Sequence, residues 1–116
     1  MNLLVKPLTG ILGLALTVAG IAGFFTSGML FVFQVDATHN VVHLVSGLVG
    51  LFAYASSQLA SRWYLMLLGI VYAVIAVIGF SMGGDVANLF MINMADNWLH
   101  AGIAATCLVV SFGSGK

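Results

Sequence analysis

The chain has 116 residues, of which 62% are hydrophobic and only 5% charged, and its formal net charge is zero. A chain of this length forms one domain, and so little polar surface excludes a soluble globular protein. Balanced charge gives no reason to expect a nucleic-acid partner. The lipid bilayer is therefore the predicted environment, with a single transmembrane domain over residues 1–116.

Four apolar segments are long enough, or nearly so, to cross a hydrocarbon core of about 30 Å, which takes roughly 20 helical residues. Backbone groups in lipid must pair within the segment, so each segment is predicted to be a helix. The helices are predicted at Leu8–Phe25, Thr38–Ser57, Trp63–Met82 and Ala95–Phe112. Pro7 is expected to begin the first helix, where its missing N–H costs nothing.

The basic residues predict the orientation of these helices. They lie at the amino end, in the second connection and at the carboxyl end: Lys6, Arg62 and Lys116. With four spans these three places share one side of the membrane. Lysine and arginine favour the cytoplasmic side, so both termini of this multi-pass protein are predicted to be cytoplasmic.

The two halves of the chain resemble each other. Gly13 and Gly23 match Gly69 and Gly79 at an offset of 56, and the polar segment after each first helix matches at an offset of 57. The chain is interpreted as two helical hairpins, at about 8–57 and 63–112. Two spans per unit keep the orientation, so the predicted fold is an all-α integral membrane protein with four transmembrane helices in two parallel hairpin repeats.

Scarce polar residues recur at the start of the second and fourth helices. Each of these helices is predicted to begin at a cap and to carry an asparagine and a histidine three apart: Asp36, Asn40 and His43 in the second, Asn93, Asn97 and His100 in the fourth. The histidines come two turns in, about 10 Å below the cap. A histidine at that depth is expected to face the bundle interior.

The same two helices also carry a candidate set of metal ligands. Two i,i+4 pairs offer three imidazoles and a carboxylate, which suit zinc or iron: His39, His43, Asp96 and His100. Because Asp96 is the match of His39, the symmetric pair His43 and His100 is the sharper target. His39 is expected to be a helix-end residue, and whether it joins this pair stays open.

Three interpretations of this motif stay open. In the structural one, Asn40, Asn97 and the histidines cap helices and form hydrogen bonds between hairpins. In the second, His43 and His100 bind a metal ion, a haem or a chlorophyll-type pigment. The third is a proton or solute path, against which stands the lack of ionisable residues in the inner half of every span.

Small residues predict the helix contacts. Ala15, Ala19 and Gly23 are expected to form a contact face on the first helix, and Gly47 and Gly50 lie below His43 on its helix.

The pair HNVVHLVSG (39–47) and ADNWLH (95–100), each after an apolar connection, resembles the bacterial membrane family catalogued as domain of unknown function 4383. The resemblance covers nearly the whole chain and implies a small four-span protein of the bacterial inner membrane. It implies no activity.

The chain contains no nucleophile–base pair, phosphate loop or carboxylate dyad, so it is not expected to be an enzyme. The predicted function is that of an auxiliary or structural subunit of a membrane complex. Its expected partners are lipid and other transmembrane helices, including those of a second copy. The alternatives are a haem-, pigment- or metal-binding protein using His43 and His100, and a small channel or transporter.

Overall fold

The computed structural model describes residues 2–26, 29–30, 33–34, 36–82, 85–86, 90–91 and 93–114. This part of the chain forms four helices, which confirms the predicted all-helical class: α1 (Asn2–Phe24), α2 (Ala37–Ser56), α3 (Gln58–Met82) and α4 (Met94–Gly113). Two short antiparallel pairs were not predicted: β1 (Met29–Leu30) with β2 (Phe33–Gln34), and β3 (Asp85–Val86) with β4 (Phe90–Met91). In the sequence, each pair connects the two helices of one half of the chain.

The prediction that the first helix begins at Pro7 is wrong, because α1 starts at Asn2 and contains Pro7. Tertiary contacts hold the extra turn. Val5 is fully buried, and Gln58 Nε2 donates a hydrogen bond of 2.8 Å to the Asn2 carbonyl. Burial of Val5 and this hydrogen bond together offset the one helical hydrogen bond that proline removes.

The predicted loop between the second and third helices is reduced to one residue, Ser57. Its N–H donates to the Ala53 carbonyl at 3.3 Å and its Oγ accepts from the Ala60 N–H at 2.9 Å, so it ends α2 and caps α3. Arg62, expected in this loop, lies in the second turn of α3.

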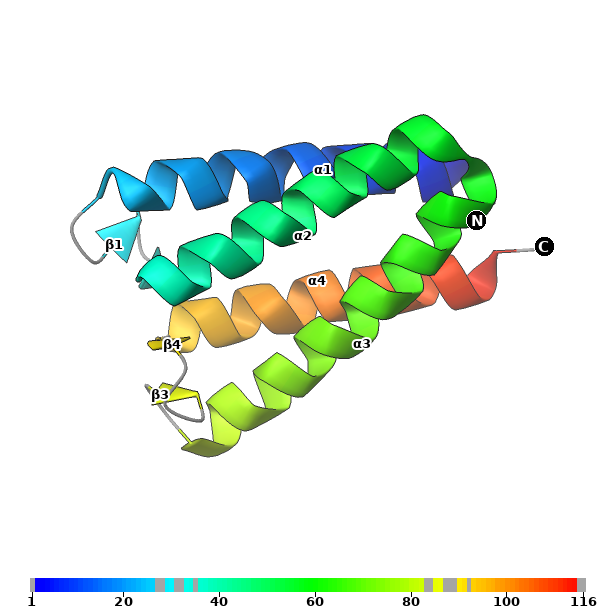
Figure 1. Ribbon diagram of the computed structural model, residues 1–116. Coiled ribbons are helices and arrows are strands. Elements are labelled where there is room, and N and C mark those ends of the chain that lie inside the picture. The colour runs from blue at the N-terminus through cyan, green and yellow to red at the C-terminus, as the bar shows by residue number, and fades with distance from the viewer. Residues whose placement is uncertain are drawn as a thin grey trace.

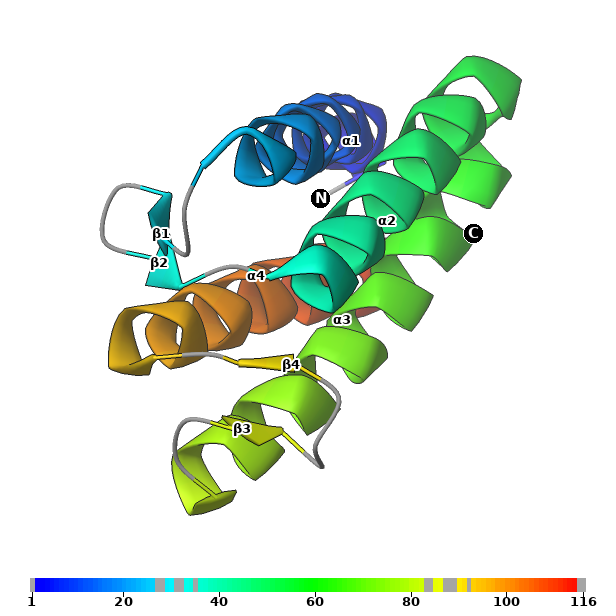
Figure 2. The same cartoon turned by 60° about the vertical axis from the view of Figure 1, so that its left-hand side comes forward.

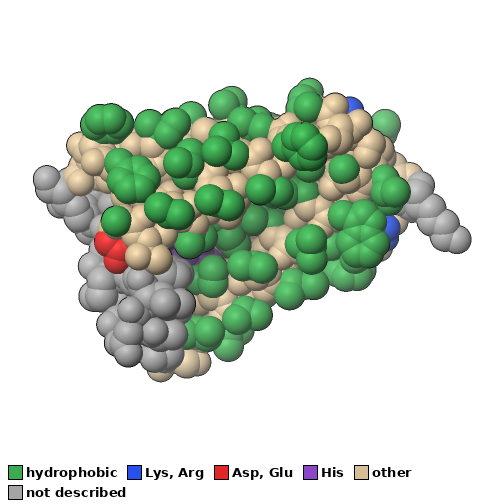
Figure 3. All heavy atoms as spheres, in the orientation of Figure 1, with side chains coloured by type: hydrophobic (Ala, Val, Ile, Leu, Met, Phe, Trp, Pro, Cys, Tyr) green, Lys and Arg blue, Asp and Glu red, His purple; other side chains and the backbone are tan. Residues whose placement is uncertain are grey.

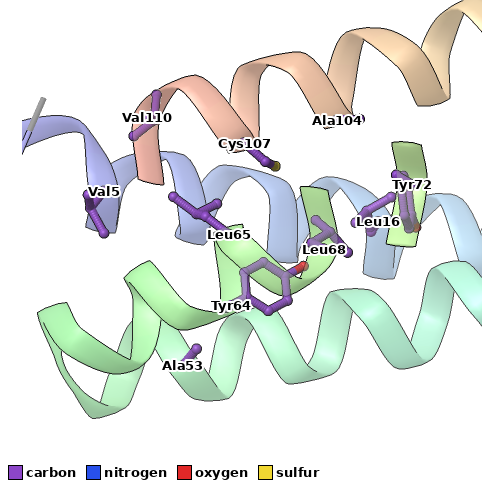
Figure 4. Close-up of a cluster of buried hydrophobic side chains, with 10 residues drawn as sticks. All are labelled: Val5, Leu16, Ala53, Tyr64, Leu65, Leu68, Tyr72, Ala104, Cys107 and Val110. Carbon is purple, nitrogen blue, oxygen red and sulfur yellow. The ribbon is translucent and has the colours of Figure 1, made fainter. Parts of the chain in front are cut away.

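Helix α1 packs mainly along α2, and α3 mainly along α4. Both chain ends lie at one end of the bundle and both strand pairs at the other (Figure 1). Helices α2 and α4 both begin at the strand end of the bundle (Figures 1 and 2). The buried hydrophobic side chains between the helices come from all four of them (Figure 4).

Glycines bring α1 and α2 into backbone contact. A Cβ on Gly13 would lie 2.7 Å from the Leu51 N, and one on Gly20 would lie 2.6 Å from the Leu44 N. The predicted contact face at Ala15 is wrong, because Ala15 is exposed. The contact face instead runs through Gly13 and Gly20, where a missing side chain allows close approach.

Burial repeats along the chain. The buried positions of α1 recur in α3 at an offset of 56: Val5, Thr9, Gly13, Leu16, Gly20 and Gly23, then Ser61, Leu65, Gly69, Tyr72, Ala76 and Gly79. Those of α2 recur in α4 at an offset of 57: His39, Asn40, His43, Gly47, Gly50 and Ala53, then Asp96, Asn97, His100, Ala104, Cys107 and Val110. The two hairpins thus turn equivalent helix faces inward.

Two of the described helices, Asn2–Phe24 and Gln58–Ser81, are long and apolar enough to cross a membrane by length and composition. Helices α2 and α4 have 20 residues each but carry polar side chains in their first two turns. Those side chains lower the mean hydropathy of α2 and α4.

Candidate functional site

Two caps set the positions of the polar side chains at the strand end. Asp36 is the N-cap of α2, and its Oδ1 accepts the His39 N–H at 2.8 Å. Asn93 is the N-cap of α4 and accepts the Asp96 N–H at 2.9 Å, while the Asp96 Oδ2 accepts the Asn93 N–H at 2.8 Å. Reciprocal bonds of this kind form a capping box.

Three histidines meet below these caps. The ring centroids of His39 and His43 lie 4.3 Å apart, those of His39 and His100 5.5 Å, and those of His43 and His100 6.2 Å. Their ligand atoms all lie within 4.8 Å of one another. All three residues are buried, so the first two turns of α2 and the second turn of α4 together build one enclosed imidazole cluster.

His39 belongs to the centre of this cluster, although the sequence suggested a helix-end residue. Its side chain is 1% exposed and contacts both of the other rings. The repeat by itself left the place of His39 open, because it compares positions between halves. The cluster needs two histidines from one half and one from the other.

Asp96 takes a different place. It is buried, but it does not belong to the group of residues whose ligand atoms lie within 4.8 Å of one another, and one of its oxygens caps its own helix. It stands one helical turn before His100 on α4. Its carboxyl group therefore caps its own helix and is not one of the three grouped donors.

The two asparagines contact different parts of their own hairpins. The Asn40 side chain occupies the space that a Cβ on Gly23 of α1 would need. The Asn97 Nδ2 makes a weak hydrogen bond of 3.9 Å to the Met94 Sδ. Asn40 therefore packs between α1 and α2.

Several imidazole nitrogens of the cluster have no hydrogen-bond partner among the described residues. They are both ring nitrogens of His43 and the Nδ1 of His100. Leaving a buried polar atom unsatisfied costs about 1–3 kcal/mol. Imidazole nitrogens that converge in a closed space and lack protein partners are the arrangement that a bound ligand would satisfy.

Tyr72 completes the floor of the site, and sequence reasoning missed it. Its ring lies edge-on to His100 with centroids 5.3 Å apart, and its hydroxyl donates to the Ser46 Oγ at 3.3 Å. Tyr64 donates to the Ser46 carbonyl at 2.7 Å. The only signal in the sequence was a hydroxyl-bearing aromatic residue within an apolar span, which does not reveal its neighbour.

The cluster suits an ion better than a macrocycle. A haem on the axis between His43 and His100 needs a wide flat slot around the midpoint of the two rings. His39 stands beside that midpoint, as its distances to both rings require. A metal ion needs no such slot, and three imidazoles with a free fourth position are a known zinc ligand set.

Comparison with known proteins adds a family and no activity. Neither the comparison with curated proteins nor that with solved structures found a match. The model of the family described as "Domain of unknown function (DUF4383)" matches residues 6–113, which is nearly the whole chain. The chain, with its four helices and its buried histidines, therefore belongs to the DUF4383 family.

Proposed function

We propose that this protein is a four-span membrane protein that binds a divalent transition-metal ion at His39, His43 and His100. The observation that carries the proposal is the convergence of three buried imidazoles from two helices, with ligand atoms within 4.8 Å of one another. The proposed role is binding rather than catalysis.

The distribution of side chains supports four spans. The histidines, asparagines and aspartate that lower the hydropathy of α2 and α4 are buried, whereas their exposed faces carry large apolar side chains such as Val45, Phe52 and Val109. A helix of 20 residues is about 30 Å long, which matches the hydrocarbon core. Apolar side chains cover the visible face of the bundle (Figure 3).

The distribution of charge supports the proposed orientation, and the pattern of burial supports the proposed repeat. Basic side chains lie at the end with the termini and an acidic one at the strand end (Figure 3). By the positive-inside rule the termini are cytoplasmic and the histidine cluster lies in the outer half of the inner membrane. Matching burial at offsets of 56 and 57 supports two parallel hairpin repeats.

The chemistry of the cluster supports a metal such as zinc. Zinc binds imidazole nitrogen at roughly 2.0–2.1 Å, which places tetrahedral donors about 3.4 Å apart. The three donors lie within 4.8 Å of one another, so bringing them to that spacing takes shifts of about an ångström. A dication among neutral ligands in a low dielectric is costly, and the buried Asp96 carboxylate on the same helix as His100 offsets part of its charge.

The test is metal analysis of the full chain in mild detergent. Protein stripped with a chelator and dialysed against zinc chloride is expected to hold stoichiometric zinc. His39→Ala, His43→Ala and His100→Ala each remove a ligand and are expected to weaken zinc binding more than roughly tenfold, since even indirect partners of a ligand contribute that much.

Thr38→Ala is the matched control, because Thr38 lies in the same first turn but is exposed. Circular dichroism on every variant separates lost binding from lost fold. A wild-type protein that is folded and free of zinc, or histidine variants that bind as tightly, would contradict the metal site. That result would favour the structural interpretation of the histidines.

A second candidate is the auxiliary subunit of a membrane complex. A surface groove of about 320 Å³ runs between α1 and α4, lined by Leu12, Trp98, Leu99, Gly102, Ile103 and Thr106. A Cβ on Gly102 would meet nothing within 4 Å, so the groove has room for a helix of a partner.

Co-purification in mild detergent tests this role. The Gly102→Leu variant is expected to lose a partner protein that the Ala105→Leu variant retains. Recovery of the wild-type protein as a free monomer would contradict this role. The alternative that the protein is a small channel or transporter stays a prediction from the sequence.

A further inference from the structure

We infer that the groove beside Lys6 binds a phospholipid with an anionic head group, with one acyl chain along α1 and the phosphate at the Lys6 ammonium. This inference rests on the membrane-spanning part of the proposed function and is independent of the metal site.

The groove is an apolar channel on the outer surface of α1 and α2, at the end with the termini. It has a volume of about 410 Å³ and is lined by Pro7, Gly10, Ile11, Leu14, Leu51 and Tyr54. Pro7, Ile11 and Leu14 follow one another along the same face of α1, over about 10 Å of helix at 1.5 Å per residue. The groove therefore runs in the direction in which an acyl chain lies.

A cation stands at the polar end of the groove. The Lys6 Nζ lies 5.4 Å from the centre of the Tyr54 ring, which is itself part of the groove wall. The acidic residues of the chain all belong to the strand end, so no carboxylate of the described residues pairs with Lys6. An ammonium group at the cytoplasmic interface beside an apolar groove complements an anionic lipid in both charge and shape.

The second hairpin lacks these features at the matching positions. Met66 stands where the first hairpin has Gly10, at an offset of 56. Arg62 matches Lys6, but its Nε donates to the Ser111 carbonyl and the Ser114 Oγ, both at 2.9 Å. The arginine thus holds the end of α4, whereas the lysine is turned toward a groove. The repeat itself therefore provides the control surface.

The experiment is native mass spectrometry of the full chain with dioleoyl-phosphatidylglycerol or dioleoyl-phosphatidylcholine added in equal amounts. Wild type is expected to retain the anionic lipid preferentially. Lys6→Gln is expected to lower that preference about fivefold, because one lysine near a membrane surface contributes on the order of 1 kcal/mol to binding of acidic lipid. Lys6→Arg is expected to keep the preference.

Filling the groove tests the acyl-chain contact. Ile11→Trp covers the groove and is expected to lower retention of both lipids, whereas Leu67→Trp, at the matching position of the second hairpin, is expected to leave it unchanged. Ile11 and Leu67 are 66% and 59% exposed, so neither change disturbs the core. Equal retention of the two lipids by wild type, or equal loss in both tryptophan variants, would overturn the proposal.

The outcomes separate this inference from the proposed function. Resistance of the protein to carbonate extraction tests membrane integration, and zinc content tests the histidine cluster. A carbonate-resistant, zinc-binding protein without lipid preference would refute the lipid groove alone.

Discussion

At the scale of single residues, the glycines between α1 and α2 determine how closely these two helices pack. A Cβ on Gly47 would collide with Thr17 and lie 2.8 Å from the Gly13 carbonyl oxygen. These obstacles include backbone atoms, which cannot rotate away. Gly47 also lies one turn below His43 on the same helix face, so the approach of α1 to α2 affects how the upper part of α2 is held.

Gly47→Ala is therefore expected to lower the free energy of unfolding by about 1–3 kcal/mol, as overpacking does elsewhere. Gly102→Ala is the matched control, since its Cβ has open space and alanine favours the helix by about 0.4–1 kcal/mol. Unfolding titrations with sodium dodecyl sulfate in mild detergent measure both values. Equal stability of the two variants would show that the glycine contact does not limit the packing of α1 and α2.

At the scale of elements, the caps of α2 and α4 connect the strand end to the site. Each cap fixes where its helix begins, and the histidines then follow at set rises and angles along the helix. The capping box at Asn93 and Asp96 holds the first turn of α4 by two hydrogen bonds. Loss of these two hydrogen bonds would let the first turn of α4, which precedes His100, unfold locally.

Asn93→Ala is expected to cost about 0.5–2 kcal/mol of stability, because the Asp96 N–H loses its acceptor. Asn93→Ser keeps a capping oxygen and is expected to retain most of that stability. Hydrogen exchange in the first turn of α4 gives the local readout, with faster exchange expected in the alanine variant only. If serine and alanine behaved alike, the side-chain cap would not be what stabilises this turn.

At the scale of the whole molecule, the two ends of the bundle differ in chemistry. One end carries the start of α1, the end of α4, Lys6 and Arg62, and the other carries the caps, the strand pairs and the histidine cluster (Figures 1 and 3). In the proposed orientation the metal site is reached from outside the cell, and the lipid groove faces the inner leaflet.

This orientation predicts which positions an impermeant thiol reagent reaches in intact cells. Thr38→Cys, exposed at the strand end, is expected to react from outside, whereas Gln58→Cys, exposed at the other end, is expected to react only after permeabilisation. The native Cys107 is fully buried and serves as the unreactive background. Labelling of Gln58→Cys in intact cells would contradict cytoplasmic termini.

The sequence by itself determined the features that depend on the spacing of residues along one segment of the chain. Long apolar runs indicated four helices, and the recurrence of Asn-x-x-His at an offset of 57 indicated the residues that α2 and α4 bury. Helical spacing along one chain segment is enough for both conclusions. The extra turns of α1 and α3 were missed because contacts between them, such as Gln58 with Asn2, hold them.

Only the tertiary structure decided how the polar residues meet. His39 joins His100, and Tyr72 lies against His100, because α2 and α4 begin at the same end of the bundle and α3 packs against both of them. That placement follows from glycine contacts and core packing between segments far apart in the chain, which no local period encodes. The symmetric pair suggested by the repeat is therefore part of an asymmetric cluster of three histidines.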